Sequence, residues 1–264
     1  MITVTTGQWY AWIAAFLWPF LRIFGLILAE PVLGHTSVPG TAKIGLAIFI
    51  ALVLTPVLPP APPVELASAA GILIGLQQLL VGLAIGFTLR IALTAVETAG
   101  QFMGLQMGLG FAVFFDPQSS AQNPIMGQFL GQFAILVFLS IDGHFLVFTA
   151  LARSFSTLPI TTDPMTPGGF RLLVEWGGEI FHTGLLLSIP VVGALLIANI
   201  ALGIMTRAAP QLNIFAVGFP LMLGVGFFAV WLTVPFIGPA IESLFEHTVL
   251  AALRIVEQLA PVAR

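Results

Sequence analysis

Cysteine is absent from this 264-residue sequence, and charged side chains make up only 7% of it. Without cysteine there is no disulfide, no thiolate zinc site, no iron–sulfur cluster and no cysteine nucleophile. Eight Lys and Arg against eleven Asp and Glu, spread along the chain, leave no basic patch, so we expect no nucleic-acid binding. What is abundant is apolar: a hydrophobic content of 58% predicts a membrane-type protein rather than a soluble domain.

The sequence motifs of common enzyme classes are also missing. It contains no G-x-S-x-G elbow, no H-E-x-x-H zinc helix and no P-loop. Glu175, Glu179 and His182 share a helical face and resemble half of a di-metal site, but a second Glu-x-x-His is lacking, so we interpret them as a charged helix end. We therefore expect no enzyme activity, no catalytic residue, no metal site and no cofactor.

Apolar runs of about the length needed to cross a bilayer recur along the chain. Proline-rich or polar turns separate them, including residues 59–63 and the stretch from Asp116 to Pro124. This pattern predicts an all-α fold built of hydrophobic helical hairpins of membrane-protein type. The six runs are residues 9–29, 44–58, 66–89, 125–151, 185–205 and 214–237.

The distribution of positive charge does not orient such a bundle. Counting Lys and Arg in alternate loops gives three on one side against four on the other. Polar groups such as Arg22 and Asp142 also fall inside apolar runs, where they need protein or water as neighbours. Two interpretations stay open: a kinked membrane bundle with inward polar faces, or helices that partner subunits cover.

The third apolar run continues as a helix to about Met107, and two features recur on it. Arg90 and Glu97 lie on one polar stripe at helical spacing. Because the rest of this helix is apolar, we expect these two side chains to contact sister subunits. Gly100, Gly104 and Gly108 form a ladder of small residues that lets another helix approach closely. That other helix can belong to the same chain or to a neighbouring subunit.

The fourth run contains two ionisable residues, Asp142 and His144, around Gly143. Such a pair inside an apolar segment is expensive and suggests a proton relay. The intervening glycine instead favours a local break, at which the two side chains satisfy freed backbone groups. We favour the structural interpretation.

Several longer segments carry a family resemblance. The opening Trp-Pro-Phe-Leu-Arg-Ile of residues 18–23, followed by residues 29–33, and the central stretch of residues 98–108 leading to Phe115-Asp116-Pro117 are the most distinctive. Further matching segments are residues 143–144, 157–160 and 209–220. Together they cover nearly the whole chain and resemble the FliR family, subunits of the flagellar type III export gate. Asp142 departs from the uncharged polar residue expected there.

The resemblance implies a single export-gate domain over residues 1–264, with a FliP-like part at 1–184 and a FliQ-like helical hairpin with a C-terminal helix at 185–264. It implies that such subunits stack in a helical cone with FliP-family and FliQ-family proteins and dock with FlhB and FlhA. The expected location is the bacterial inner membrane, in the flagellar basal body, in contact with membrane lipid. The expected task is to form part of the entrance channel through which unfolded protein substrates are secreted.

A gate that retains ions but passes an unfolded chain needs a mobile, largely apolar constriction. The segment after Gly108 fits this description, and related loops contribute to the plug of the closed pore. We expect the pore and plug residues to be Phe111, Phe114, Phe115, Asp116 and Pro117. An ordinary interhelical loop is the alternative for this segment. For the whole chain, a small-solute secondary transporter is the alternative function, although the paired repeats typical of that class are not evident.

Overall fold

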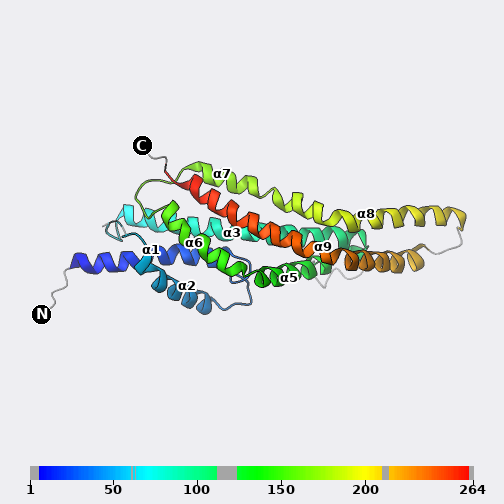
Figure 1. The fold of residues 1–264 in the computed structure, drawn as a ribbon, viewed down its shortest axis with the longest axis horizontal. Helices are drawn as coiled ribbons and strands as arrows, with labels where there is room; N and C mark the ends of the chain where they lie inside the picture. Colours follow the sequence, from blue (N-terminus) through cyan, green and yellow to red (C-terminus); the bar gives the residue numbers. More distant parts are fainter. Residues whose placement is uncertain (1–5, 61, 63, 112–123, 210–213, 262–264) are drawn as a thin grey trace. The chain divides into compact units, whose positions relative to one another are not determined.

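The computed structural model describes residues 6–60, 62, 64–111, 124–209 and 214–261, and within them it contains helices and no strands (Figure 1). The predicted all-α class is therefore confirmed. The helices are α1 (Thr6–Ala29), α2 (Gly40–Leu54), η1 (Thr55–Val57), α3 (Ala69–Gln106), η2 (Leu109–Phe111), α5 (Ile125–Ser140), α6 (Gly143–Thr157), α7 (Pro167–Trp176), α8 (Glu179–Ala208) and α9 (Ile214–Leu259).

Five of the described helices are long and apolar enough to cross a membrane, or six if α5 and α6 together form one broken span. The predicted fourth run is thus two helices, interrupted at Ile141 and Asp142. The last run continues as one helix to Leu259, because Pro220, Pro235 and Pro239 are accommodated inside α9. The short helix α7 ends at Trp176, so Glu175 lies on a different helix from Glu179 and His182, with which the sequence predicted a shared helical face.

The chain divides into two compact units, each made of separate sequence segments. The first contains Met1–Ile91, Asp142–Gly177 and Glu246–Arg264. The second contains Ala92–Ile141 and Gly178–Phe245. α3 begins in the first unit and continues into the second from Ala92. In the most apolar 18-residue stretch of α3, about two thirds of the residues are buried, against 17% in that of the span over α7 and α8, so α8 is largely uncovered.

In the first unit, α1 and α3 pack backbone to backbone. A Cβ on Gly82 of α3 would lie within 3.0 Å of backbone atoms of Arg22 and Leu26 on α1. A Cβ on Gly86 would similarly meet the backbone of Leu26 and Glu30. Because a backbone cannot move aside as a side chain can, only glycine permits this approach.

The C-terminal end of α9 is held in the first unit by the start of α7. The backbone N–H of Thr166 donates to Leu259 O at 3.1 Å, and its hydroxyl donates to Gln258 O. The last carbonyls of a helix have no partner inside the helix, so Thr166 satisfies two of them from outside. Gly169 completes the contact, since a Cβ there would lie within 3.0 Å of Leu259 and of Ile255 O.

Candidate gate segment and its supporting helices

The predicted gate segment begins where α3 ends. Met107 N donates to Met103 O, and Gly108 N donates to Leu105 O. Gly108 has φ of 84°, the left-handed conformation that commonly ends a helix and that favours glycine. The backbone of Phe111 lies in η2, whereas Phe114, Phe115, Asp116 and Pro117 lie outside the described residues. A plug role for these five residues stays a prediction.

The two ends of this segment are joined by close packing of α3 on α5. A Cβ on Gly100 would lie within 3.0 Å of Met126 and Gly127 backbone atoms, and one on Gly104 would lie 3.3 Å from Met126 Cβ. Pro124 precedes α5, so the residues that follow the segment are also those that pack on α3. The segment between Gly108 and Pro124 is therefore anchored at both ends on one tight helix pair within the second unit.

Glu97 adds a polar group to the same helix pair. Its Cγ and Oε1 would be 2.9 and 3.0 Å from a Cβ on Gly131, and its backbone carbonyl would be 3.0 Å from one on Gly127. The half-buried Glu97 side chain therefore packs over α5 of its own chain, as Gly100 and Gly104 do. Their additional role in contacts with sister subunits stays a prediction.

Two more helices enclose this end of α3. Met107 is fully buried, and its side-chain atoms would lie 2.5 to 3.0 Å from a Cβ on Gly226 of α9. Gly184 of α8 approaches α3 in the same way, since a Cβ there would lie 3.1 Å from Ala95 O and 3.2 Å from Thr98 Cβ. A glycine lies at each of these helix contacts and permits close packing. The C-terminal part of α3 and the residue that follows it are therefore packed closely against α5, α8 and α9 before the gate segment begins.

Arg90, the other half of the predicted polar stripe, lies in the first unit and is exposed. No hydrogen bond or ion pair of its side chain occurs among the described residues. An exposed guanidinium on an apolar helix is available to a partner. Its predicted subunit contact remains untested, as does that of Gly108.

The sequence did not reveal the most extensive buried polar cluster, which is centred on Arg22. This side chain is 0% exposed. Its Nε donates to Gln78 Oε1 at 2.8 Å, Nη1 to Ser154 Oγ at 3.1 Å and Nη2 to Leu158 O at 2.9 Å. The guanidinium carbon also lies 4.1 Å from the ring centroid of Phe155. Arg22 was expected to have protein or water as neighbours, and the structure shows that they are protein.

Arg22 is a buried cation that pairs with no carboxylate in the described chain. The position of its partners at the end of α6 explains how the charge is stabilised. Leu158 is the C-cap of α6, and Ser154 and Phe155 lie in its last turn. The C-terminal end of a helix carries about half a negative charge, which stabilises a nearby cation. Three neutral acceptors, the helix end and the aromatic face together replace the water that Arg22 loses.

The break between α5 and α6 does not have the predicted side-chain contacts. Asp142 adopts a left-handed conformation with φ of 55°, and its carbonyl, not its carboxylate, accepts the N–H of Phe145. Its side chain caps no N–H of α6. The His144 ring lies against that of Phe145 at an angle of 39°, and its Nδ1 is buried without a partner in the described residues. The break is real, but the two side chains do not satisfy its backbone groups.

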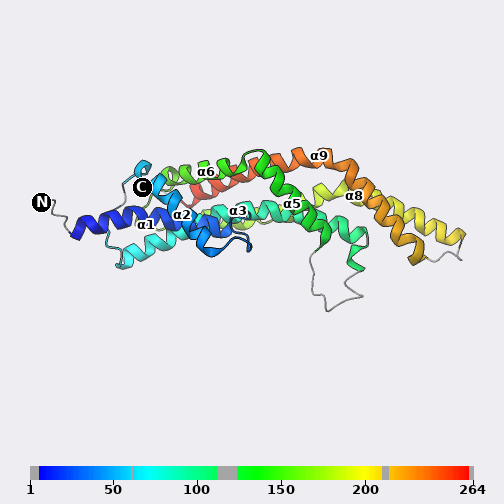
Figure 2. The ribbon, with the colours of Figure 1, turned by 90° about the horizontal axis from the view of Figure 1, so that it is seen from below.

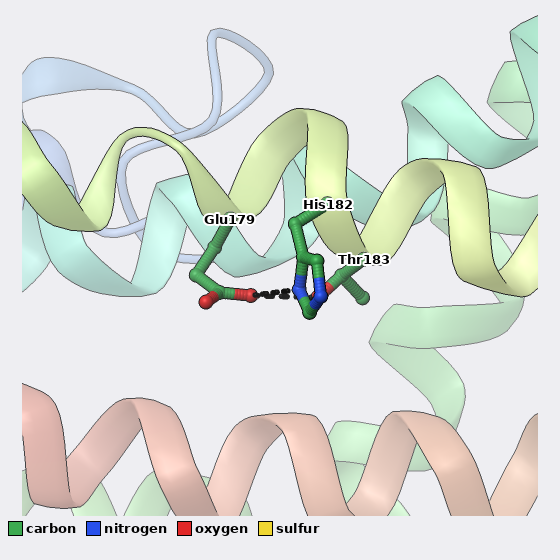
Figure 3. A network of polar contacts seen from close by, with 3 residues as sticks. All are labelled: Glu179, His182 and Thr183. Atoms are coloured by element: carbon green, nitrogen blue, oxygen red, sulfur yellow. Dashed lines mark hydrogen bonds and ion pairs between the residues drawn. The ribbon is translucent and has the colours of Figure 1, made fainter.

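A small polar network marks the first turn of α8 (Figure 3). Thr183 Oγ1 donates to Glu179 Oε2 at 2.8 Å, and His182 Nδ1 lies 3.3 Å from the same oxygen. Within the described part of the chain, no three His, Cys, Asp or Glu side chains gather as a metal site would require. Glu175 pairs with Arg171 on α7 instead, so the three residues do not converge. The network is consistent with a charged helix end.

Comparison with known proteins decides the family. The model of "Bacterial export proteins, family 1" matches residues 13–248. The chain belongs to this family. Proteins named flagellar biosynthetic protein FliR are similar over nearly their full length: those of Pectobacterium carotovorum subsp. carotovorum and Escherichia coli (strain K12) are each 40% identical over 247 residues, covering 94% of both chains. That of Bacillus subtilis (strain 168) is 32% identical over 238 residues.

These matches confirm the family resemblance found in the sequence. The family description concerns protein export, and the names of the relatives concern flagellar biosynthesis. Nothing in these matches supports the alternative of a small-solute transporter. The absence of catalytic activity stays a prediction, because neither the family description nor the names address it.

Proposed function

We propose that this chain is a subunit of the flagellar protein export apparatus and forms part of the entrance channel of its gate. The similarity to FliR proteins over 94% of both chains carries this proposal. The structure supports it with a large apolar surface on α8 and α9 that a lone soluble domain would bury. Unfolded flagellar proteins are the proposed substrates.

The proposed partners are the FliP-family and FliQ-family gate subunits, together with FlhB and FlhA. The proposed location is the bacterial inner membrane within the basal body, which the five apolar helices of sufficient length support. Residues 1–184 serve as the FliP-like part, and residues 185–264 as the FliQ-like hairpin with its C-terminal helix.

Affinity purification of the full-length chain from its native membrane tests this assignment. We expect FliP-family and FliQ-family subunits to co-purify and deletion of the gene to abolish motility, with motility restored by the intact chain. Purification of the chain alone, combined with solute uptake by vesicles that contain only this chain, would overturn it.

Within the gate, the segment from Phe111 to Pro124 contributes to the plug. The support is the packing of the two helices that flank it: α3 and α5 are in backbone contact at Gly100. Deletion of Phe111 to Ser120 should make cells permeable to ions. Intact permeability with normal secretion would reject the plug role and leave gate membership standing.

Arg90 and Glu97 contribute to contacts with sister subunits. The exposure of Arg90 on a largely buried helix supports this for the arginine. Arg90→Ala combined with Glu97→Ala should lower the yield of assembled gate. An unchanged yield would exclude the contact.

A further inference from the structure

The α1–α2 hairpin is close in length to the thickness of one bilayer. α1 has 24 residues, of which 18 run from Trp12 to Ala29, and α2 continues into η1, so that Gly40–Val57 also has 18 residues. At 1.5 Å per residue, 18 helical residues extend about 27 Å, close to the roughly 30 Å of a hydrocarbon core. By the same rule the 38 residues of α3 extend about 57 Å and the 46 of α9 about 69 Å. Those two helices are too long for a single upright crossing.

The two members of the hairpin contact one another. α2 lies beside α1 and contacts it (Figure 2). η1, which follows α2, contacts α1 as well. Within α2 the buried residues are Ala47 and Ala51, one helical turn apart. Such a narrow strip of small side chains suits one close helix contact and leaves most of the circumference of α2 uncovered.

The uncovered surface of α2 is apolar on all sides. Phe49 is 64% exposed and Leu52 59%, and residues 44–64 include no charged side chain. A helix that is hydrophobic all round is buried in protein or crosses a membrane. Its length distinguishes these cases, because a packing partner sets no particular length whereas a bilayer does.

The two ends of the hairpin carry aromatic and polar residues, which are typical of the surfaces of a membrane. At the start of α1, Trp9 and Trp12 are 55% and 58% exposed, with ring centroids 5.7 Å apart. Exposed tryptophan is typical of the headgroup region. At the opposite end the polar groups are satisfied locally, since Lys43 Nζ donates to Gly34 O at 2.8 Å and Glu30 accepts the N–H of Leu33.

Arg22, the charged residue in the middle part of the hairpin, does not lie on its outer surface. Residues 1–21 include no charged side chain, and Arg22 is fully buried with three hydrogen bonds inside the first unit. An unpaired charge that faced lipid would be strongly unfavourable. The cluster around Arg22 avoids that cost.

We propose that the α1–α2 hairpin is the bilayer anchor of this chain, with phospholipid acyl chains covering the outer face of α2 and the headgroup region holding Trp9 and Trp12. This rests on the proposed membrane location of the apparatus. It assigns a specific lipid-facing surface, formed by Ile44, Ile48, Phe49, Leu52 and Val53 together with the tryptophan pair.

The absence of native cysteine allows a direct test by single nitroxide labels. The full chain, purified with its co-purifying subunits, is reconstituted in vesicles of phosphatidylethanolamine and phosphatidylglycerol. Phe49→Cys probes the middle of α2, Trp12→Cys the rim, and Thr162→Cys, on an exposed loop of the same unit, reports water. Ala47→Cys reports a buried site. Collisions with oxygen measure lipid exposure, and collisions with a water-soluble nickel chelate measure water exposure.

We expect a severalfold higher ratio of oxygen to nickel collisions at position 49 than at position 162, with an intermediate ratio at position 12. Nickel collisions at position 49 as frequent as at position 162 would show that water covers α2. Protection from both reagents, as at position 47, would show that a protein partner covers it. Either result overturns the anchor, whereas loss of co-purifying subunits would instead contradict the proposed function.

Discussion

The buried cluster around Arg22 makes a strong prediction about stability. In Arg22→Met the side chain keeps a stem of similar shape but loses every donor, so Gln78 Oε1 and Leu158 O lose the partners that the structure shows. A buried acceptor left without a donor costs about 1–3 kcal/mol, and loss of the contact with Phe155 adds about 0.5–2 kcal/mol.

An opposing term reduces this sum. The methionine no longer requires a charge to be held away from water, and that desolvation amounts to several kcal/mol per buried ion. Because every partner of Arg22 is neutral, the substitution leaves unpaired acceptors but no uncompensated charge, so the net loss lies in the lower part of the sum of these terms. We expect the free energy of unfolding to fall by about 3 kcal/mol, which lowers the Tm of a chain of this size by about 6–12 °C.

Thermal unfolding of the purified chain in detergent measures this effect, and Arg153→Met is the matched control. Arg153 is adjacent to Ser154 on α6 but is exposed, so its substitution should stay within about 0.5 kcal/mol. Arg22→Lys separates charge from geometry. Lysine retains the charge but has one donor nitrogen, whereas three different nitrogens of Arg22 hold the acceptors, so it should rescue little.

The reasoning is refuted if Arg22→Met unfolds at the same temperature as Arg153→Met and the native chain. If Arg22→Lys restores full stability, the charge at the end of α6 matters and the forked geometry does not.

Two further predictions concern the α3–α5 contact that flanks the gate segment and the turn that follows α1. Gly100→Ala should destabilise the chain by about 1–3 kcal/mol, because its Cβ would overlap the backbone of Met126. Gly193→Ala on α8 meets nothing within 4 Å and should be neutral or slightly stabilising, so equal Tm values for the two variants would count against the tight α3–α5 contact. Burial raises the pKa of Glu30 above its ordinary value of about 4.5, although backbone N–H groups of residues 32–34 oppose the shift. The folded state then binds the proton more tightly, so the Tm of the native chain should fall relative to Glu30→Gln as the pH rises above about 4.5. A difference in Tm that is constant or grows with pH would contradict this.

Local patterns in the sequence predicted the helices well where they are long and periodic. The extension of the third run to about Met107 matches α3, which ends at Gln106, and the break around Gly143 separates α5 from α6. The last apolar run covers residues 214–237, whereas α9 continues to Leu259, since a helix need not be apolar along its whole length. Pro220, Pro235 and Pro239 all lie inside this one helix.

The composition by itself determined that this chain is helical, apolar and without thiol chemistry, because these properties depend on counts and periodicity. Its motifs determined the family. Only the tertiary structure decided which helix the glycines of α3 contact, since a ladder of small residues permits close approach without naming the partner. It alone showed what holds Arg22, whose partners lie 56, 132 and 136 residues away. Contacts over such separations follow from how helices pack, which no local pattern encodes.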